Sequence, residues 1–257
     1  MTWWFYGCSY TAGHEIHDTA IKNKDGTLTW TINPDDVFER NKQDSWAGTL
    51  CKLQNVELCN RAEYGSSSGQ MMVRFLSDIR QHNIDRGDFV VWASTFSRRI
   101  FDIQDNHSKS WVPRTLKPTI DHTGTSNIHL LDTWSDTHLL YRWFQDLYQF
   151  VTICHHEGYQ CMIIPCGDPV QSELRLLIEK IGIKNEELLK ISEYIISRIK
   201  KKIVLFEDRK SFSTYTGDLM DANGGQEFQD DWYTPGGHPT KRAHDLWAER
   251  IYQSLNE

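Results

Sequence analysis

The chain has 257 residues, 39% of them hydrophobic and 25% charged, which is typical of a folded globular protein and not of a disordered or collagen-like chain. Its formal charge is −7, from 28 Lys and Arg against 35 Asp and Glu, and this balance argues against nucleic-acid binding. No apolar stretch approaches the roughly 20 residues that span a bilayer, and the N-terminal residues lack the basic start of a signal peptide. We therefore expect no nucleic-acid partner and no membrane partner.

Five short apolar runs predict β-strands, at residues 3–6, 56–60, 88–93, 160–165 and 203–206. They show little polar alternation, as strands do when helices cover both faces of a parallel sheet. Elsewhere apolar residues recur every three or four positions, which predicts helices over 66–84, 134–158, 187–200 and from about 240 onward. This alternation indicates an α/β fold: a three-layer α/β/α sandwich with a parallel sheet of about five strands, of flavodoxin-like type. The first strand should lie inside the sheet.

Two segments interrupt the alternation, at about 14–44 and 96–133. Both are polar and both follow the carboxyl end of a predicted strand, where α/β sheets bind ligands. Loops of this length are usually functional or form small excursions. Because the sequence has no repeat, low-complexity tract or linker, we expect one domain over residues 1–257 that carries these two loop excursions.

The first candidate for chemistry is the segment Gly7-Cys8-Ser9-Tyr10-Thr11-Ala12-Gly13, directly after the first predicted strand. A serine there stands at the carboxyl edge of the sheet in a tight turn, and the flanking glycines let backbone amides approach a substrate oxygen. A plain Gly/Ser turn has the same appearance. Ser9 therefore needs partners before it can be taken as a nucleophile.

Two further segments could supply those partners. Pro235-Gly236-Gly237-His238-Pro239 precedes the last predicted helix, and a histidine restrained between a glycine turn and a proline suits a general base. Residues 60–69 follow the second predicted strand, and their Gly-Ser-Ser-Ser run at a helix start offers free amides for an oxyanion. Each also has a plainer interpretation, as a helix entry or a serine N-cap. All three segments fall at the carboxyl edge of the predicted sheet.

Together these segments resemble the blocks of the SGNH (GDSL-type) hydrolase family, and its phage-encoded members in particular, over nearly the whole chain. In that family the serine of a Gly-x-Ser-x-Thr-x-Gly block is the nucleophile, and it matches Ser9. The resemblance implies that the amides of Ser9 and Gly65 form the oxyanion hole. It also implies that His238, in a His-Pro-x-x-x-x-His pattern completed by Pro239 and His244, is the general base. No metal or organic cofactor is expected.

The chain departs from the family's pattern at the third block, Gly-x-Asn-Asp, in which the Asn is a further oxyanion donor. After the third predicted strand the chain instead reads Trp92-Ala93-Ser94-Thr95-Phe96. The hydroxyl of Thr95, or that of Ser94, is the candidate replacement. Tyr10 and Arg98 are candidate substrate contacts, although a solvated surface pair is the favoured interpretation of Arg98 and Arg99.

The second departure concerns the acid that orients the histidine. The family places an Asp two or three residues before the histidine, where this chain has Gly236 and Pro235. Asp231 is a candidate acid that would have to fold back toward His238. A backbone carbonyl or a water molecule is favoured over it as the partner of the second imidazole nitrogen, which needs an acceptor for the correct tautomer.

Two other clusters contain metal-binding residue types. His14-Glu15-x-His17-Asp18 lies beside the serine turn and is expected to line the pocket or face solvent, because a metal needs ligands that converge in space. Cys154-His155-His156, with the later cysteines, could be read as zinc ligands but is expected to be core and helix end. The cysteines show no CxxC pair and are expected to be reduced, at positions 8, 51, 59, 154, 161 and 166.

We therefore expect a serine ester hydrolase that acts on a small acyl ester, such as an O-acetylated glycan, through a Ser9–His238 dyad. The alternative is a catalytically weakened domain of the same fold, used as a phage virion or glycan-binding component, since the acid and the Asn are missing. The expected location is cytoplasmic or virion-associated, and the sequence does not indicate an oligomeric state.

Overall fold

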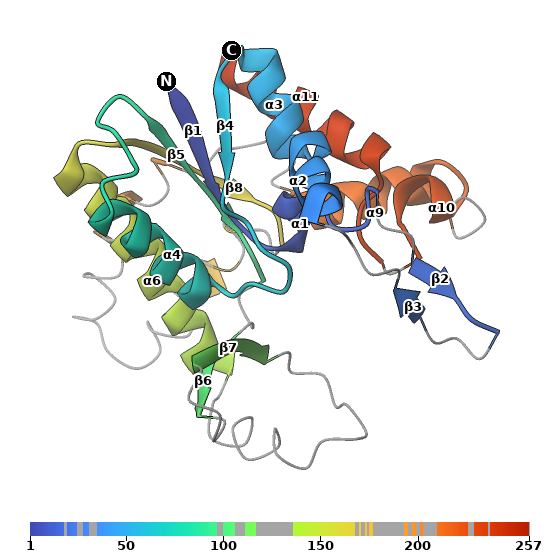
Figure 1. Cartoon of the computed structure of the whole chain (residues 1–257), viewed down its shortest axis with the longest axis horizontal. Helices are drawn as coiled ribbons and strands as arrows, with labels where there is room; N and C mark the ends of the chain where they lie inside the picture. The colour runs from blue at the N-terminus through green and yellow to red at the C-terminus, as the bar shows by residue number, and fades with distance from the viewer. Residues whose placement is uncertain are drawn as a thin grey trace.

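The structure is a computed structural model that describes residues 1–17, 20–24, 28–30, 35–96, 100–105, 111–116, 136–167, 170, 173, 175–176, 193–194, 197–198, 201–202, 210–225, 229–235 and 237–256. Among these residues it is an α/β structure in which helices cover both faces of a parallel sheet (Figure 1). The predicted fold class is therefore confirmed.

The main sheet has four described strands: β1 (Thr2–Tyr6), β4 (Glu57–Asn60), β5 (Phe89–Ser94) and β8 (Gln160–Pro165). Their order is β4-β1-β5-β8 and every neighbouring pair is parallel. The first strand thus lies inside the sheet, as its uninterrupted apolar run predicts. The fifth predicted strand, 203–206, lies outside the described residues. Just before it, the Lys202 carbonyl accepts a hydrogen bond from the Ile163 amide of β8, at 2.7 Å.

Helices α4 (Ser68–Arg80) and α6 (Asp136–Glu157) cover one face of the sheet, and α3 (Trp46–Gln54) and α11 (Lys241–Asn256) cover the other (Figure 1). The helices predicted over 66–84, over 134–158 and from about 240 are confirmed. The helix predicted over 187–200 falls mostly outside the described residues. The periodicity did not indicate α3, nor α1 (Ser9–Ala12), α2 (Asp35–Asp44), α9 (Phe212–Ala222) and α10 (Gln229–Trp232).

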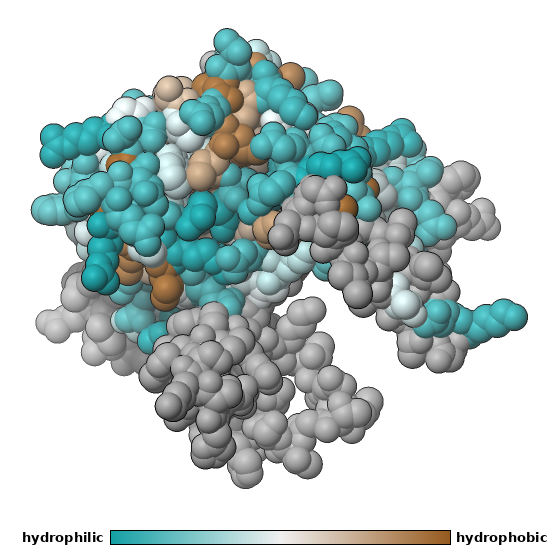
Figure 2. Space-filling model, viewed as in Figure 1, coloured by the Kyte–Doolittle hydropathy of each residue, from teal (hydrophilic) through white to brown (hydrophobic). Residues whose placement is uncertain are grey.

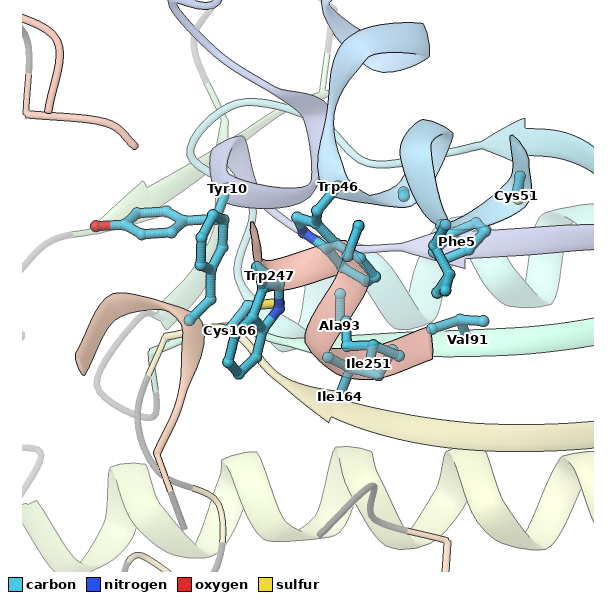
Figure 3. Packing of buried hydrophobic residues seen from close by; sticks show 14 of the residues in the cluster. Phe5, Tyr10, Trp46, Cys51, Val91, Ala93, Ile164, Cys166, Trp247 and Ile251 are labelled. Carbon is cyan, nitrogen blue, oxygen red and sulfur yellow. The ribbon is translucent and has the colours of Figure 1, made fainter. Parts of the chain in front are cut away.

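Alternate residues of β1 divide the core into two layers. Trp4 and Tyr6 pack with residues of α4 and α6, whereas Trp3 and Phe5 pack with residues of α3 and α11. Figure 3 shows the second layer, where Trp46 and Trp247 lie over the sheet. Successive side chains of a strand point to opposite faces, so an apolar strand supports both layers. Burying one large apolar side chain contributes about 1.5–3 kcal/mol, which makes β1 central to the stability of the fold.

The described parts of the two loop excursions are small structural units. The first contains the antiparallel pair β2 (Ala20–Lys22) and β3 (Leu28–Trp30), followed by α2. The second contains the antiparallel pair β6 (Ile100–Asp105) and β7 (Trp111–Leu116). Both excursions follow the carboxyl end of a strand of the main sheet, β1 in the first case and β5 in the second. They therefore start at the edge where the candidate site residues lie.

On the face drawn in Figure 2 the coloured residues are mostly hydrophilic, and hydrophobic atoms occur there in small patches. None of the described helices combines the length and the apolar character needed to cross a membrane. All six cysteines are described, none of them is joined in a disulfide, and all are buried except for the half-buried Cys59.

Candidate active site

The turn that carries Ser9 is built by two glycines. A Cβ on Gly7 would lie 2.4 Å from the Oγ1 of Thr11, so only glycine fits between the end of β1 and the start of α1. Gly13 ends α1 with φ 71°, and its amide donates to the Ser9 carbonyl; a Cβ there would lie 2.3 Å from the Asn41 carbonyl oxygen. Ser9 is the first residue of α1, a position whose amide has no carbonyl partner within its own helix.

The end of β4 and the loop after it are held against this turn by hydrogen bonds to the backbone carbonyls of the turn. The Asn60 side chain donates to the Thr11 carbonyl at 2.9 Å, and the Glu63 amide donates to the Gly7 carbonyl at 3.2 Å. Gly65 follows with φ 73°, and no atom lies within 4 Å of where its Cβ would be. Gly65, the candidate oxyanion residue, therefore borders open space next to the serine turn.

Thr95 at the end of β5 steadies the same loop. Its hydroxyl is fully buried and donates to the Ser66 carbonyl at 3.3 Å, while the Ser94 hydroxyl donates to the Thr95 carbonyl at 3.4 Å. The contact with Ser66 ties Thr95 to the loop that carries Gly65. The expected role of Thr95 or Ser94 as an oxyanion donor stays a prediction.

His238 stands in a closed loop between α10 and α11. The Thr234 amide donates to the His238 carbonyl at 2.8 Å, the His238 amide donates to the Thr234 hydroxyl at 3.1 Å, and Tyr233 pairs with Pro239 in an antiparallel bridge. These contacts fix the backbone on both sides of the histidine. Its imidazole keeps 20% of its surface exposed, which leaves it within reach of a substrate.

The Nδ1 atom of His238 contacts the Glu15 carboxylate, with 2.7 Å between Nδ1 and Oε2. The Glu15 side chain is fully buried, and its Oε2 also accepts a hydrogen bond of 2.5 Å from the Thr234 hydroxyl. The expectation of a backbone carbonyl, a water molecule or Asp231 at this nitrogen is therefore wrong. Asp231 instead uses its backbone carbonyl, which accepts a bond of 2.8 Å from the Thr240 hydroxyl. Glu15 reaches the histidine because the chain turns back after α1.

Glu15 is ionised in this environment. Burial alone would raise the pKa of the carboxyl group, but hydrogen bonds from His238 and Thr234 and the nearby imidazoles outweigh it and hold the pKa below its usual value. A carboxylate only accepts hydrogen bonds. The Nδ1 of His238 must therefore carry the proton, which leaves the lone pair on Nε2, as a general base requires.

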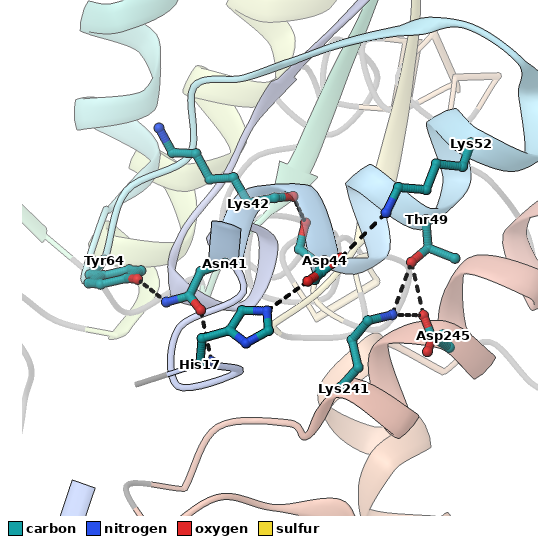
Figure 4. Close-up of polar contacts among 10 residues, drawn as sticks. His17, Asn41, Lys42, Asp44, Thr49, Lys52, Tyr64, Lys241 and Asp245 are labelled. Atoms are coloured by element: carbon teal, nitrogen blue, oxygen red, sulfur yellow. Dashed lines mark hydrogen bonds and ion pairs between the residues drawn. The ribbon is translucent and has the colours of Figure 1, made fainter. Parts of the chain in front are cut away.

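The Nε2 atom of His238 faces His14, with 3.3 Å between Nε2 and the His14 Nδ1. The His14 ring stacks on Tyr64, with ring centroids 3.8 Å apart, and the Tyr64 hydroxyl accepts a bond of 2.9 Å from the Asn41 side chain (Figure 4). No hydrogen bond joins Ser9 to His238 among the described residues. The ring of Tyr10, next to Ser9, lies 6.0 Å from the His238 ring. The serine segment and the histidine loop therefore meet, although the predicted contact between Ser9 and His238 stays a prediction.

The residues of the segment His14-Glu15-x-His17, which contains metal-binding residue types, contact different partners. His14 and Glu15 both face His238, whereas the His17 Nε2 lies 2.7 Å from the Asp44 carboxylate (Figure 4). The part of the chain that the structure describes contains no group of three or more Cys, His, Asp or Glu side chains arranged to hold a metal ion. The expectation that this segment lines the site holds for two of its residues.

Other sequence-predicted residues fall in different places. His244 is fully buried and accepts a bond of 3.0 Å from the Trp46 amide, and burial lowers its pKa to about 3, so it is a neutral link between α11 and α3. Tyr10 is 8% exposed and packs edge-on against Phe96 and Phe212. Arg98 lies outside the described residues, and its proposed contact with substrate is not tested.

Sequence reasoning missed Glu15 and Thr234 as partners of His238. Thr234 lies four residues before His238, whereas the family's acid lies two or three residues before its histidine. This nearly matching spacing is the signal that Thr234 belongs to the site. Glu15 gave a weaker signal, as a carboxylate in a segment expected to line the pocket.

The chain matches no protein-family model and no curated protein. Among solved structures it is similar over 99% of its length to TesA, with 13% identity, 98% of that chain covered and a TM-score of 0.51. It is also similar to a member of the lipolytic G-D-S-L family from Veillonella parvula (13% identity, 100% of this chain and 99% of that one, TM-score 0.49). An acetyl xylan esterase, AlAXEase, matches with 11% identity over 99% of this chain and 100% of that one, at a TM-score of 0.49. At 13% identity the likeness to TesA shows a shared fold alone.

Proposed function

We propose that this protein is a serine ester hydrolase of SGNH type, with Ser9 as nucleophile and His238 as general base. The substrate is a small acyl ester, and an O-acetyl group on a glycan is the class we favour. The fold supports this proposal, as does the position of Ser9, His238 and the Gly65 loop at the carboxyl edge of the sheet. The sequence match of these residues to the family's blocks supports their roles.

In the proposed reaction the Ser9 oxygen bonds to the carbonyl carbon of the ester while its proton passes to Nε2 of His238. The electron pair of the carbonyl bond moves to oxygen, and the amides of Ser9 and Gly65 hold the resulting oxyanion. When the tetrahedral intermediate collapses, the alcohol leaves with the proton from Nε2. Water then attacks the acyl-enzyme by the same route and releases the carboxylic acid and free Ser9.

The observation that carries the proposal is the orientation of His238. Its Nε2 points toward the segment that carries Ser9, where it meets His14 at 3.3 Å, and its Nδ1 points away toward a buried carboxylate. An imidazole held at one nitrogen with its lone pair turned toward a serine segment is arranged to accept a proton.

The experiment is hydrolysis of p-nitrophenyl acetate by the full chain and by Ser9→Ala. Removal of the nucleophile should lower kcat by about 10⁴-fold or more. Ser77→Ala, on α4, is the matched control and should keep the wild-type rate. Equal rates for the wild type and Ser9→Ala would refute Ser9 as the nucleophile.

A second candidate function is a weakened domain of the same fold that binds an acylated glycan without cleaving it. The contact that favours it is the one between His14 and the His238 Nε2, since a lone pair shared with His14 is not free for Ser9. Calorimetry with an O-acetylated oligosaccharide separates the two: saturable binding with the acetyl group intact after incubation favours binding, and release of acetate favours hydrolysis.

A further inference from the structure

We propose that Glu15 is the positioning carboxylate of His238, so that one short segment of the chain carries both the nucleophile and the acid of the catalytic site. The inference rests on the proposed function and names the partner that the family's pattern leaves vacant in this sequence. Ser9 begins α1 and Glu15 follows Gly13, which ends it, while the histidine comes from a loop near the other end of the chain.

The contact has the geometry of a charge-assisted hydrogen bond. The Glu15 Oε2 and the His238 Nδ1 are 2.7 Å apart, within the range for such bonds. The carboxylate side chain is 0% exposed, so water does not compete for it. Hydrogen bonds at low dielectric are stronger than in water, and the bond fixes both the ring plane and the tautomer of the imidazole.

The backbone of the segment is shaped to make this contact. Glu15 has φ 70°, a left-handed conformation that is strained for a residue with a side chain and is kept only when the surroundings enforce it. The turn begins at Gly13, also left-handed. Gly13 and Glu15, both left-handed, reverse the direction of the chain after α1. This reversal brings the Glu15 carboxylate to the Nδ1 atom of His238.

Thr234 completes the arrangement from the histidine loop. Its hydroxyl donates to the Glu15 Oε2 at 2.5 Å and accepts from the His238 amide at 3.1 Å. It therefore joins the carboxylate to the loop that carries the histidine. In the family's pattern that loop supplies the acid itself, whereas here it supplies a hydroxyl that holds an acid delivered from the serine segment.

The other carboxylate oxygen, Oε1, is buried and has no hydrogen-bond partner in the described structure. A buried carboxylate that is only partly satisfied is costly, and a positive charge beside it relieves that cost. His238 becomes positively charged when it takes the proton of Ser9. The interaction with Glu15 is then stronger in the transition state than in the resting enzyme, which is the condition for accelerating the reaction.

The experiment compares the full-length wild type with Glu15→Gln, which keeps the size of the side chain and removes its charge. We expect kcat for p-nitrophenyl acetate to fall by about 10³–10⁴-fold with KM changed by less than about threefold, as loss of the acid does in the serine-protease triad. Glu15→Asp keeps the carboxylate and should recover at least tenfold of that loss. Asp231→Asn is the matched control and should stay within about twofold of the wild type.

A second readout is the tautomer of His238, measured by ¹⁵N NMR on histidine-labelled protein and assigned with His238→Ala. The wild type should hold the proton on Nδ1, and Glu15→Gln should lose that preference, because an amide can donate to Nδ1 as well as accept from it. A kcat within tenfold of the wild type in Glu15→Gln, or an unchanged tautomer, overturns the inference.

The two readouts distinguish this inference from the proposed function. A wild type that hydrolyses no ester but holds a Glu15-dependent Nδ1 proton refutes the hydrolase and keeps Glu15 as the partner of His238. A wild type that is active and loses nothing in Glu15→Gln keeps the hydrolase and refutes the role of Glu15.

Discussion

Two buried carboxylates, one on α4 and one in the turn that follows α1, differ in how their oxygens are used. Asp78, 1% exposed, has both oxygens occupied: Oδ2 accepts from the Tyr6 hydroxyl at 2.8 Å and from Arg61 at 2.9 Å, and Oδ1 accepts from Asn83 at 3.2 Å. Glu15, fully buried, has one oxygen occupied and the other without a partner. A carboxylate whose oxygens all accept hydrogen bonds, and which pairs with an arginine, stabilises the fold. A carboxylate with one oxygen unpaired, and which pairs with an imidazole, is arranged to assist proton transfer.

The pKa values around Asp78 agree with a structural role. Burial first, and then the neighbouring Asp78 charge, raise the pKa of the Tyr6 hydroxyl far above its usual value, so this hydroxyl stays a donor. Although burial disfavours its charge, the pKa of Arg61 is raised by its bond to Asp78. None of these groups changes its charge at physiological pH. The network around Glu15, by contrast, joins the carboxylate to the imidazole of His238 and, through it, to that of His14.

The largest expected effect is on stability, from Asp78→Ala. The substitution leaves the buried Tyr6 hydroxyl without an acceptor and Arg61 without its partner, which should lower the free energy of unfolding by about 3 kcal/mol. Because Arg61 is 44% exposed and can turn to water, the loss should not exceed that of a fully buried pair. Thermal unfolding should show a midpoint lower by about 6–12 °C.

The esterase activity of the folded fraction of Asp78→Ala should remain near that of the wild type. A large loss of kcat in the folded variant would contradict the division of the two carboxylates into structural and chemical roles.

Thr234→Val tests the support of Glu15 with an intermediate effect. The variant keeps the shape of the side chain but removes the hydroxyl that donates to the carboxylate, a charge-assisted bond worth about 1.5–3 kcal/mol. We expect kcat to fall by about 10–100-fold, less than in Glu15→Gln. Thr234→Ser, which retains the hydroxyl, should recover most of the rate. Equal activity in the Val and Ser variants would show that the hydroxyl does not act through Glu15.

His14→Phe sharpens the account of the other imidazole nitrogen. Phenylalanine can keep the stacking on Tyr64 but cannot donate a hydrogen bond to Nε2 of His238. That nitrogen has a single lone pair and therefore accepts only one hydrogen bond at a time. Removing this competitor should raise kcat/KM by about two- to tenfold, the worth of one hydrogen bond. A loss of more than tenfold would instead place His14 in the transfer of the proton.

The smallest effect is the dependence of stability on pH. The pKa of Glu15 is below its ordinary value of 4.5 in the folded protein, because the bonds from His238 and Thr234 outweigh the opposing effect of burial. The folded state thus releases this proton more readily than the unfolded chain. The contribution of Glu15 to stability is complete above that ordinary value and is lost as the pH falls through the folded-state pKa.

Urea titrations of the wild type and Glu15→Gln at about pH 6 and about pH 3 should therefore show a difference in the free energy of unfolding that shrinks at the lower pH. A difference that grows on acidification would contradict an ionised Glu15.

The main elements of the fold could be predicted because their signal is local. An apolar run such as that of β1 marks a strand covered on both faces, and the spacing of apolar residues in α4 and α6 marks amphipathic helices. The two antiparallel pairs and five helices, α1, α2, α3, α9 and α10, were not predicted. They are short and lie outside the main alternation, where tertiary contacts decide the structure.

The candidate site was predictable only in part, for the same reason. Ser9, Gly65 and His238 stand in segments whose spacing has a recognisable form. The bond between Glu15 and His238 joins residues 223 positions apart and depends on a left-handed backbone at a residue that rarely adopts one. Local spacing contains neither feature, because the carboxylate lies beside the histidine in space and far from it in sequence.

Covalent labelling with a fluorophosphonate tests the central claim most directly, because it reports whether His238, held by Glu15, activates Ser9. Peptide mass spectrometry of the labelled wild type should find one adduct, on Ser9, that forms far more slowly in Glu15→Gln and not at all in Ser9→Ala. A folded wild type that takes up no label, or takes it up on another serine, would contradict the account.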